Sequence, residues 1–398
     1  MADNNENKVL NVPHLRFPEF TKEWEMASLQ DIAAVNPKSN PLQNSFVYID
    51  LEAVEKGELR KIQEVMREEA PSRAQRIIYK NDILFQCVRP YQKNNYIHKI
   101  QSKSNQQWVA STGYAQIRTT EIPNYIYHLL NTDGFNRKVM VRCTGSSYPA
   151  INSEDLATIR FYLTTDTKEQ LKISRLLDLL DERIATQTKI IEDLKKLKSA
   201  ISKQVFAQEP NEWCRLDTLF SKGKAGGTPT STNKEYYNGE IPFLSINDIT
   251  KQGKYVRYTE NHLSQSGLEN SSAWVVPKYS LIMSMYASVG LVTINEIPTT
   301  TSQAMFAMQL KDKGLLDYLY YYLSYFKYRY IHKYLETGTQ SNINADIIRG
   351  IMIPIYGHSR NMEIASTLQG IDVKIDNELS VLKLFNKQKN YLLSQMFI

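Results

Sequence analysis

The stretch that decides the fold is a heptad sequence that the chain carries twice. Residues 168–206 read KEQLKISRLLDLLDERIATQTKIIEDLKKLKSAISKQVF, and residues 359–397 read SRNMEIASTLQGIDVKIDNELSVLKLFNKQKNYLLSQMF. Positions reached by alternating steps of four and three residues, from Ile173 and from Ile364, are apolar in eight of ten cases in each copy. This spacing predicts two long helices with a coiled-coil seam, the first of them roughly 58 Å long at about 1.5 Å per residue.

Two seam positions in each copy are polar, and they recur at the same places. Gln187 corresponds to Glu378 and Lys198 to Lys389, both at an offset of 191 residues (378 − 187 and 389 − 198). Polar residues inside a seam fix register and partner choice at some cost in stability. The predicted apolar seam includes Ile173, Leu177, Leu180, Ile184, Ile191, Leu194 and Ile201 in the first helix and Ile364, Leu368, Ile371, Ile375, Leu382, Phe385 and Leu392 in the second, and each copy ends on one further apolar position, Val205 or Met396.

The two helices are expected to pair with each other in an antiparallel coiled coil. A chain whose halves are related by a two-fold axis would place them in this way. A parallel pair needs a long return loop, and the stretch 208–212 that follows the first helix is too short for one. The alternative is that each helix packs back on its own globular domain.

Further landmarks repeat ahead of each helix. Thr144-Gly145 recurs as Thr337-Gly338 after 193 residues (337 − 144), and Ile151-Asn152 recurs as Ile343-Asn344 after 192 (343 − 151). We expect each set to lead into the long helix that follows it. A repeat of this length suits a domain plus a helix and is too long for a solenoid unit. The sequence therefore predicts a pseudo-two-fold molecule, equivalent to a homodimer joined end to end.

Both globular parts combine short strand-like runs with helices at irregular spacing, which predicts an α+β fold. Between the shared landmarks the two copies diverge, as expected when one scaffold binds two different ligands. The opening Glu23-Trp24 is matched with Glu212-Trp213. The other matched runs are 46–49 with 243–246, 82–86 with 280–284, and 125–130 with 318–323.

The landmarks divide the chain into five segments. A flexible tail (1–13) precedes the first globular domain (14–166) and the first long helix (167–207), and the second globular domain (208–357) precedes the second long helix (358–398).

Composition limits the classes of function. The net charge of +6 and the pI near 8.9 permit a polyanionic partner without requiring one. The three cysteines are widely separated, which suits a reducing cytoplasm, and no apolar stretch approaches the roughly 20 residues of a membrane span. The first residues, MADNNENK, contain no apolar signal core. We therefore expect a cytoplasmic protein that does not enter the membrane.

Motifs of catalysis are missing from the sequence. There is no phosphate-binding GxxxxGK[ST] loop and no GxGxxG after a strand, and the six histidines have no metal-ligand spacing. We therefore expect no catalytic residue, no metal and no cofactor in this chain.

Several polar loops are candidates for contact with nucleic acid. The run 89–96 combines cations, amides and aromatic rings directly after a strand-like stretch, and 222–234 carries three lysines, three glycines and no acid, which predicts a flexible cationic loop. Cations neutralise phosphates, whereas Gln and Asn pair with adenine edges. For each loop an ordinary surface turn is an equal alternative. The candidates are Arg89, Tyr91, Gln92, Lys93 and Ser147 in the first domain and Lys224, Thr228, Ser288, Thr339 and Gln340 in the second.

Three features of the chain occur together. They are the order domain, long helix, domain, long helix, the opening Leu15-Arg16-Phe17-Pro18 before Trp24, and the paired Thr-Gly and Ile-Asn landmarks. With these features the chain resembles the specificity subunit of type I restriction–modification systems, over about residues 14–398. The resemblance implies a non-catalytic subunit whose two domains each read one half of a split sequence in double-stranded DNA. It also implies two methyltransferase subunits and nuclease–translocase subunits as partners, with S-adenosylmethionine, ATP and Mg²⁺ in those chains. The alternative function is a bivalent coiled-coil scaffold that grips two proteins without DNA.

Overall fold

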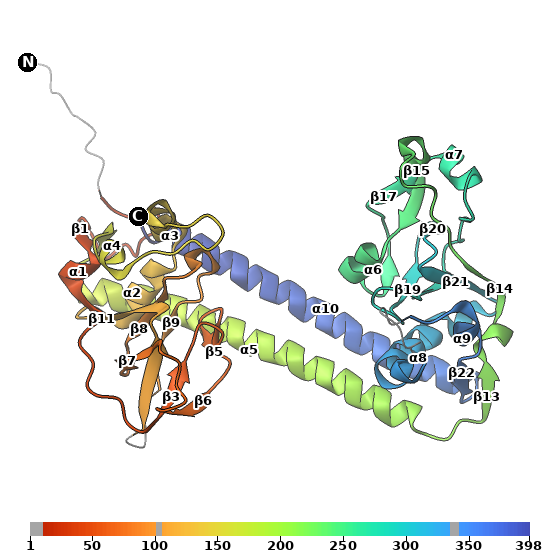
Figure 1. Ribbon diagram of the computed structural model, residues 1–398, viewed down its shortest axis with the longest axis horizontal. Coiled ribbons are helices and arrows are strands. Elements are labelled where there is room, and N and C mark those ends of the chain that lie inside the picture. Colours follow the sequence, from red (N-terminus) through yellow and green to blue (C-terminus); the bar gives the residue numbers. More distant parts are fainter. Residues whose placement is uncertain (1–10, 101–105, 335–341) are drawn as a thin grey trace, which may run out of the picture. The chain divides into compact units, whose positions relative to one another are not determined.

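The computed structural model describes residues 11–100, 106–334 and 342–398, and they form two compact units (Figure 1). Unit 1 contains the chain up to Lys189 together with Ser380–Ile398, and unit 2 contains Ile190–Leu379. Two long helices, α5 (Thr167–Phe206) and α10 (His358–Gln395), each contribute one part to unit 1 and the other part to unit 2. No helix in the described ranges has both the length and the apolarity needed to cross a bilayer.

Unit 1 is built on two four-stranded sheets and a short strand pair. One sheet has the order β2-β11-β8-β9, the other has the order β6-β3-β10-β7, and β1 pairs with β12. The strands are β1 (Glu25–Ser28), β2 (Ala33–Val35), β3 (Ser45–Ile49), β6 (Gln63–Met66), β7 (Ala74–Ile78), β8 (Ile83–Gln86), β9 (Tyr96–Ile97), β10 (Gln107–Ser111), β11 (Tyr114–Thr119) and β12 (Arg160–Leu163), with a hairpin of β4 (Val54–Glu55) and β5 (Glu58–Leu59). The short helices are α1 (Leu29–Ile32), η1 (Pro90–Gln92), α2 (Pro123–Leu130), α3 (Asp133–Arg142) and α4 (Ser153–Ala157).

Unit 2 has a five-stranded sheet, a three-stranded sheet and a strand pair. The orders are β14-β21-β18-β19-β16 and β17-β15-β20, and β13 pairs with β22. The strands are β13 (Glu212–Arg215), β14 (Phe220–Ala225), β15 (Tyr237–Leu244), β16 (Tyr255–Val256), β17 (Asn261–Leu263), β18 (Leu281–Ser284), β19 (Val292–Asn295), β20 (Thr300–Thr301), β21 (Met305–Leu310) and β22 (Met352–Ile355). The short helices are η2 (Leu216–Thr218), η3 (Lys234–Tyr236), α6 (Ile246–Gln252), α7 (Gln265–Glu269), η4 (Lys313–Leu315), α8 (Leu316–Arg329), η5 (Ile331–Lys333) and α9 (Ala345–Arg349).

The two globular domains share one frame. The order β2-β11-β8-β9 in unit 1 corresponds to β14-β21-β18-β19 in unit 2. The second sheets correspond as well, because β3 lies between antiparallel β6 and parallel β10 just as β15 lies between antiparallel β17 and parallel β20. The fold is therefore α+β with two tandem related domains, as predicted.

Strand register corrects one predicted match. In unit 1 Met26 faces Tyr162 across the β1–β12 pair, and in unit 2 Trp213 faces Pro354 across β13–β22. Trp213 therefore corresponds to Met26 and not to Trp24. Trp24 is 2% exposed and belongs to the core, whereas Trp213 is 52% exposed. The prediction was wrong because a shared Glu-Trp pair was read without the strand register.

The shared Ile-Asn landmarks have structural roles. Ile151 and Ile343 are buried, while Asn152 and Asn344 cap the short helices α4 and α9 by accepting the backbone N–H of Asp155 and of Ile347. A cap of this kind satisfies a helix N–H that would otherwise lack a partner. Strand β12 or β22 then follows, and only after it does the long helix begin. The expectation that these landmarks lead directly into the long helices was therefore wrong.

Each unit is completed by the far end of the helix that starts in the other unit. Phe397, just after α10, lies in the core of unit 1, with its ring centroid 5.4 Å from that of Tyr125 and 6.1 Å from that of Trp24. Phe206, the last residue of α5, lies in the core of unit 2, with its centroid 6.1 Å from that of Tyr318. Each core thus depends on both long helices.

The helices run antiparallel within each unit. In unit 1 Asp181 contacts Lys389, and Arg183 lies over the ring of Phe385. Each of the sixteen apolar seam residues predicted above is buried or half-buried. Some of this burial comes from the helix's own domain, because Ile173 and Leu177 belong to the core of unit 1. Each long helix therefore packs both on its own globular domain and on the other long helix, so the two alternatives given above occur together.

We expect Phe397→Ala to destabilise unit 1 by about 3–5 kcal/mol, because it removes a ring that packs against both Trp24 and Tyr125. Hydrogen exchange of the α2 amides reports on this unit. Phe206→Ala is the matched variant and should expose α8 in unit 2 instead. Leu384→Ala, on an exposed position of α10, is the control and should change stability by less than about 0.5 kcal/mol. Loss of protection in unit 2 from Phe397→Ala would contradict this assignment.

Candidate nucleic-acid interface

The loop between β8 and β9 of unit 1 has an unusual backbone. Arg89 and Lys93, on either side of η1, have φ angles of 54° and 52° in the left-handed region. For residues other than glycine this conformation costs on the order of 1–3 kcal/mol, and it persists only where the surroundings enforce it. Such residues gather at functional sites, so this loop is the first candidate.

Hydrogen bonds hold the loop in this shape. The backbone N–H of Arg89 donates to the carbonyl of Pro149 at 2.7 Å, and that of Ile151 donates to the carbonyl of Cys87 at 3.0 Å. Inside the loop the Gln86 side chain accepts the N–H of Asn94 at 3.1 Å and donates to Gln92 Oε1 at 3.0 Å. The β8–β9 loop and the segment 144–150 therefore form one joined surface.

This surface presents several types of recognition chemistry. The Arg89 guanidinium carbon lies 4.4 Å from the centroid of the exposed Tyr148 ring. Tyr91, Gln92 and Ser147 are also exposed. A guanidinium stacked on an aromatic ring keeps its N–H groups free in the plane, where they can pair with phosphate oxygens or guanine edges. Amide and hydroxyl groups beside it add donors and acceptors for base edges.

Lys93 is committed elsewhere. Its Nζ donates to Asp133 Oδ1 at 2.6 Å and to the carbonyl of Asn131 at 3.0 Å. The hydrogen bond from Lys93 holds the pKa of the Asp133 carboxyl below its ordinary value. The cation is thus neutralised within unit 1 and ties the loop to the start of α3, so the geometry gives Lys93 a structural contact.

The corresponding loop of unit 2 lies between β18 and β19. Ala287 and Ser288 have φ angles of 42° and 58°, again left-handed. The Ser284 hydroxyl accepts the N–H of Leu291 at 2.9 Å and donates to the carbonyl of Ser288 at 2.7 Å. Ile343 N–H donates to the carbonyl of Met285 at 3.1 Å, as Ile151 does to Cys87 in unit 1. Both domains thus hold a strained loop at the same place by the same link.

An open groove of about 560 Å³ borders this loop. Exposed Tyr286 supplies the aromatic ring, and the side chain of Gln303 is hydrogen-bonded to that of Thr228. The groove is lined by Ala225, Met285, Tyr286, Gln303, Ala304, Asn344 and Ala345. Thr228 and the loop that carries Ser288 are therefore brought to one area.

The cationic segment 222–234 is more ordered than predicted. Strand β14 continues to Ala225, and Gly226 and Gly227 are buried. A Cβ on Gly226 would lie 2.0 Å from the carbonyl oxygen of Thr301, so these glycines permit close packing and do not provide flexibility. Lys224 projects from this strand and donates to the carbonyl of Ser272 at 3.3 Å. The prediction of a flexible loop was wrong because glycine is favoured both in flexible loops and where two backbone segments pack closely, and the sequence alone does not distinguish the two.

The structure groups some candidates and leaves others apart. Arg89, Tyr91, Gln92 and Ser147 share the joined surface of unit 1, while Thr339 and Gln340 lie outside the described residues. Reading of the separate loops overlooked Tyr148 and Tyr286 as candidates. The predicted match of 82–86 with 280–284 already places the loops after β8 and β18 at corresponding positions, and it is the signal that points to Tyr286.

Comparison with known proteins identifies the family. The model of the type I restriction modification DNA specificity domain matches residues 21–196 and again residues 209–382, so the chain belongs to this family and contains two copies of its domain. The specificity subunit of the type I restriction enzyme HindI of Haemophilus influenzae is 21% identical, over 82% of this chain and 84% of that protein. The MjaIX specificity subunit of Methanocaldococcus jannaschii is 26% identical, but the match spans 44% of this chain and only 40% of that protein.

Solved structures share the fold. A chain of a type I restriction–modification system, from a study of its complex assembly and conformational transition, aligns over 94% of this chain and 97% of its own length, with a TM-score of 0.61 and 20% identity. The S subunit of a type I restriction–modification system from M. genitalium aligns over 97% and 99%, with a TM-score of 0.59 and 14% identity.

We expect Arg89→Ala to weaken binding of target DNA by about 1–3 kcal/mol, because it removes the one guanidinium that the unit 1 surface presents on Tyr148. The measurement is fluorescence anisotropy of a labelled target duplex. Lys93→Ala is the matched control, because it removes a cation from the same loop whose charge is already paired with Asp133. We expect this variant to weaken DNA binding by less than about 0.5 kcal/mol. Equal losses in the two variants would show that net charge matters and the placed side chain does not.

Proposed function

We propose that this chain is the DNA sequence-specificity subunit of a type I restriction–modification complex and reads the two halves of an asymmetric, bipartite target. The observation that carries the proposal is the pair of strained loops at corresponding places on one frame. Arg89, Tyr91 and Gln92 follow β8, whereas Tyr286, Ala287 and Ser288 follow β18. One scaffold with two different loops binds two different half-sites, whereas identical loops would read a palindrome.

In this proposal the long helices serve as a spacer between the two half-sites. A helix of 40 residues, as in α5, is roughly 60 Å long and reaches beyond the ~34 Å of one DNA turn. The base pairs between the half-sites remain unread. The target therefore consists of two short specific parts and a gap of fixed length.

Catalysis belongs to partner chains in this proposal. Two methyltransferase subunits use S-adenosylmethionine to methylate adenine, and nuclease–translocase subunits use ATP and Mg²⁺, all in the cytoplasm. The net charge of +6 is modest for a DNA-binding protein of 398 residues. The partner subunits supply part of the phosphate neutralisation.

Two measurements test the proposal. Sequencing of methylated adenines in cells that express the chain with its methyltransferase should return one bipartite, asymmetric motif. Filter binding by the purified complex should weaken steeply as salt rises, because binding releases the counterions of neutralised phosphates. Binding without sequence preference or salt dependence would refute DNA reading and favour the bivalent protein scaffold.

We further expect Tyr286→Ala and Arg89→Ala to relax different halves of the motif, because the two residues belong to different units. Each variant should lower discrimination at one half-site by about 1–3 kcal/mol and leave the other half unchanged. Methylated-adenine sequencing measures both halves in one experiment. Relaxation of the same half by both variants would contradict the assignment of one half-site to each unit.

A further inference from the structure

Two ion pairs join α5 to α10, one in each unit. In unit 1 Asp181 Oδ1 lies 2.5 Å from Lys389 Nζ, and in unit 2 Asp372 Oδ1 lies 2.5 Å from Lys198 Nζ. The repeat relates these pairs, since Asp372 is 191 residues after Asp181 (372 − 181) and Lys389 is 191 after Lys198 (389 − 198). To these pairs each long helix therefore contributes one aspartate from its earlier part and one lysine from its later part.

These pairs are more shielded than the ion pair between Asp193 and Lys196 within α5. The four side chains are between 23% and 33% exposed. By contrast, Asp193 and Lys196, which pair within α5, are 57% and 75% exposed. A partly dehydrated charge that loses its partner is costly, whereas an exposed pair contributes little. An incorrect alignment of α5 with α10 would leave these charges without partners, so the inter-helix pairs make such an alignment much less stable than the correct one.

Only one alignment of the helices satisfies both pairs. A parallel alignment that superposes the repeats would place Asp181 beside Asp372 and Lys198 beside Lys389, so that like charges meet. An antiparallel pair shifted by one heptad would move each lysine about 10.5 Å from its aspartate. The apolar seam is similar along its length and would permit other alignments of the two helices. The charges therefore fix the antiparallel orientation and the register of the helix pair.

Each pair also lies against its recognition domain. In unit 2 the hydroxyl of Tyr321, on α8, donates to Asp372 Oδ2 at 2.9 Å, and Lys254 Nζ donates to the Tyr321 hydroxyl at 3.1 Å. Burial raises the pKa of Tyr321, and the Asp372 carboxylate raises it further, so this phenol remains a donor. A polar chain thus connects the helix pair with the domain.

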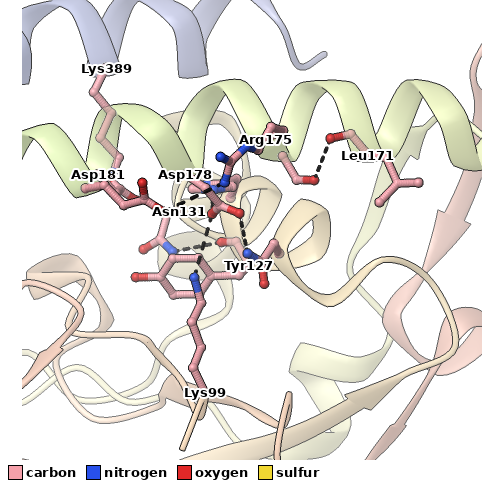
Figure 2. A network of polar contacts seen from close by, with 12 residues as sticks. Lys99, Tyr127, Asn131, Leu171, Arg175, Asp178, Asp181 and Lys389 are labelled. Carbon is pink, nitrogen blue, oxygen red and sulfur yellow. Dashed lines mark hydrogen bonds and ion pairs between the residues drawn. The ribbon is translucent and has the colours of Figure 1, made fainter.

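The arrangement in unit 1 is similar but uses other residues. Figure 2 shows Lys389 extending from α10 to Asp181 on α5, with Tyr127 of α2 and Asn131 close by. Burial and then the charge of Asp181 raise the pKa of Tyr127. One turn earlier on α5, Asp178 contacts His128 at 2.9 Å. The domain of unit 1 therefore also meets the helices at the ion pair.

We propose that Asp181, Lys389, Lys198 and Asp372 are positioning residues that set the orientation and register of the helix pair and thereby the gap between the two DNA half-sites. This inference rests on the proposed function. One base pair adds about 3.4 Å along the duplex, so a spacer must be fixed to within a few ångströms to reject a gap that differs by one pair. Two ion pairs with direct contact distances provide that constraint.

The test uses the methyltransferase complex and a DNA library in which the gap is one base pair shorter, correct or one longer. Asp181→Lys places a cation against Lys389 and should lower discrimination among these gaps by about tenfold, while preference at both half-sites remains. Adding Lys389→Asp restores an opposite pair and should restore the discrimination. Asp193→Lys is the control, with the same charge change on α5 at a residue that pairs only within that helix.

The neutral variants Asp181→Asn and Lys389→Gln cover the case in which charge reversal prevents folding, and they should also reduce gap discrimination. Lowered thermal stability with unchanged gap discrimination in these variants would overturn the positioning role. So would failure of the exchanged pair to restore discrimination in a folded complex. If the unaltered complex methylates no bipartite motif, the proposed function itself fails, which is a distinct result.

Discussion

The structure depends on an exchange of helix ends. Neither globular domain has a complete core from its own residues. Leu393 of α10 and Phe397 just after that helix belong to the core of unit 1, and Phe206 of α5 belongs to the core of unit 2. Burial of an aromatic side chain is worth several kcal/mol, which is a large part of the stability of a domain. The long helices are consequently parts of both cores.

This sharing of the long helices by both cores explains how the two copies diverge without losing the fold. The residues that they share lie in the frame of each domain, such as buried Ile151 and Ile343 and the caps Asn152 and Asn344 of the short helices α4 and α9. The loops after β8 and β18 are joined to that frame by backbone hydrogen bonds and are held internally by the side chains of Gln86 and Ser284. The other side chains of these loops, which make none of these hydrogen bonds, are therefore free to change.

The helices and the class of fold were predictable because they follow from spacing. A heptad pattern reveals which residues face a seam, and every predicted seam residue is at least half-buried. The site was only partly predictable. Arg89 is a candidate from its loop alone, but its contact with Tyr148 joins segments 59 residues apart (148 − 89), and no local pattern encodes that contact. The pairing of Lys93 with Asp133 and the close packing of Gly226 were missed for the same reason.

The exchange of helix ends also sets an order in time. During synthesis the sheets of unit 1 emerge first, yet Phe397 is made 272 residues after its partner Tyr125 (397 − 125). In unit 2 the order is reversed, because Phe206 is synthesised before its partner Tyr318 and is already present when the domain around Tyr318 is made. Contacts between residues so far apart in sequence form slowly, and an incomplete core exposes apolar surface in the meantime. The domain that is made first therefore completes its core last, and the nascent chain must keep that half soluble until residue 397 has been added.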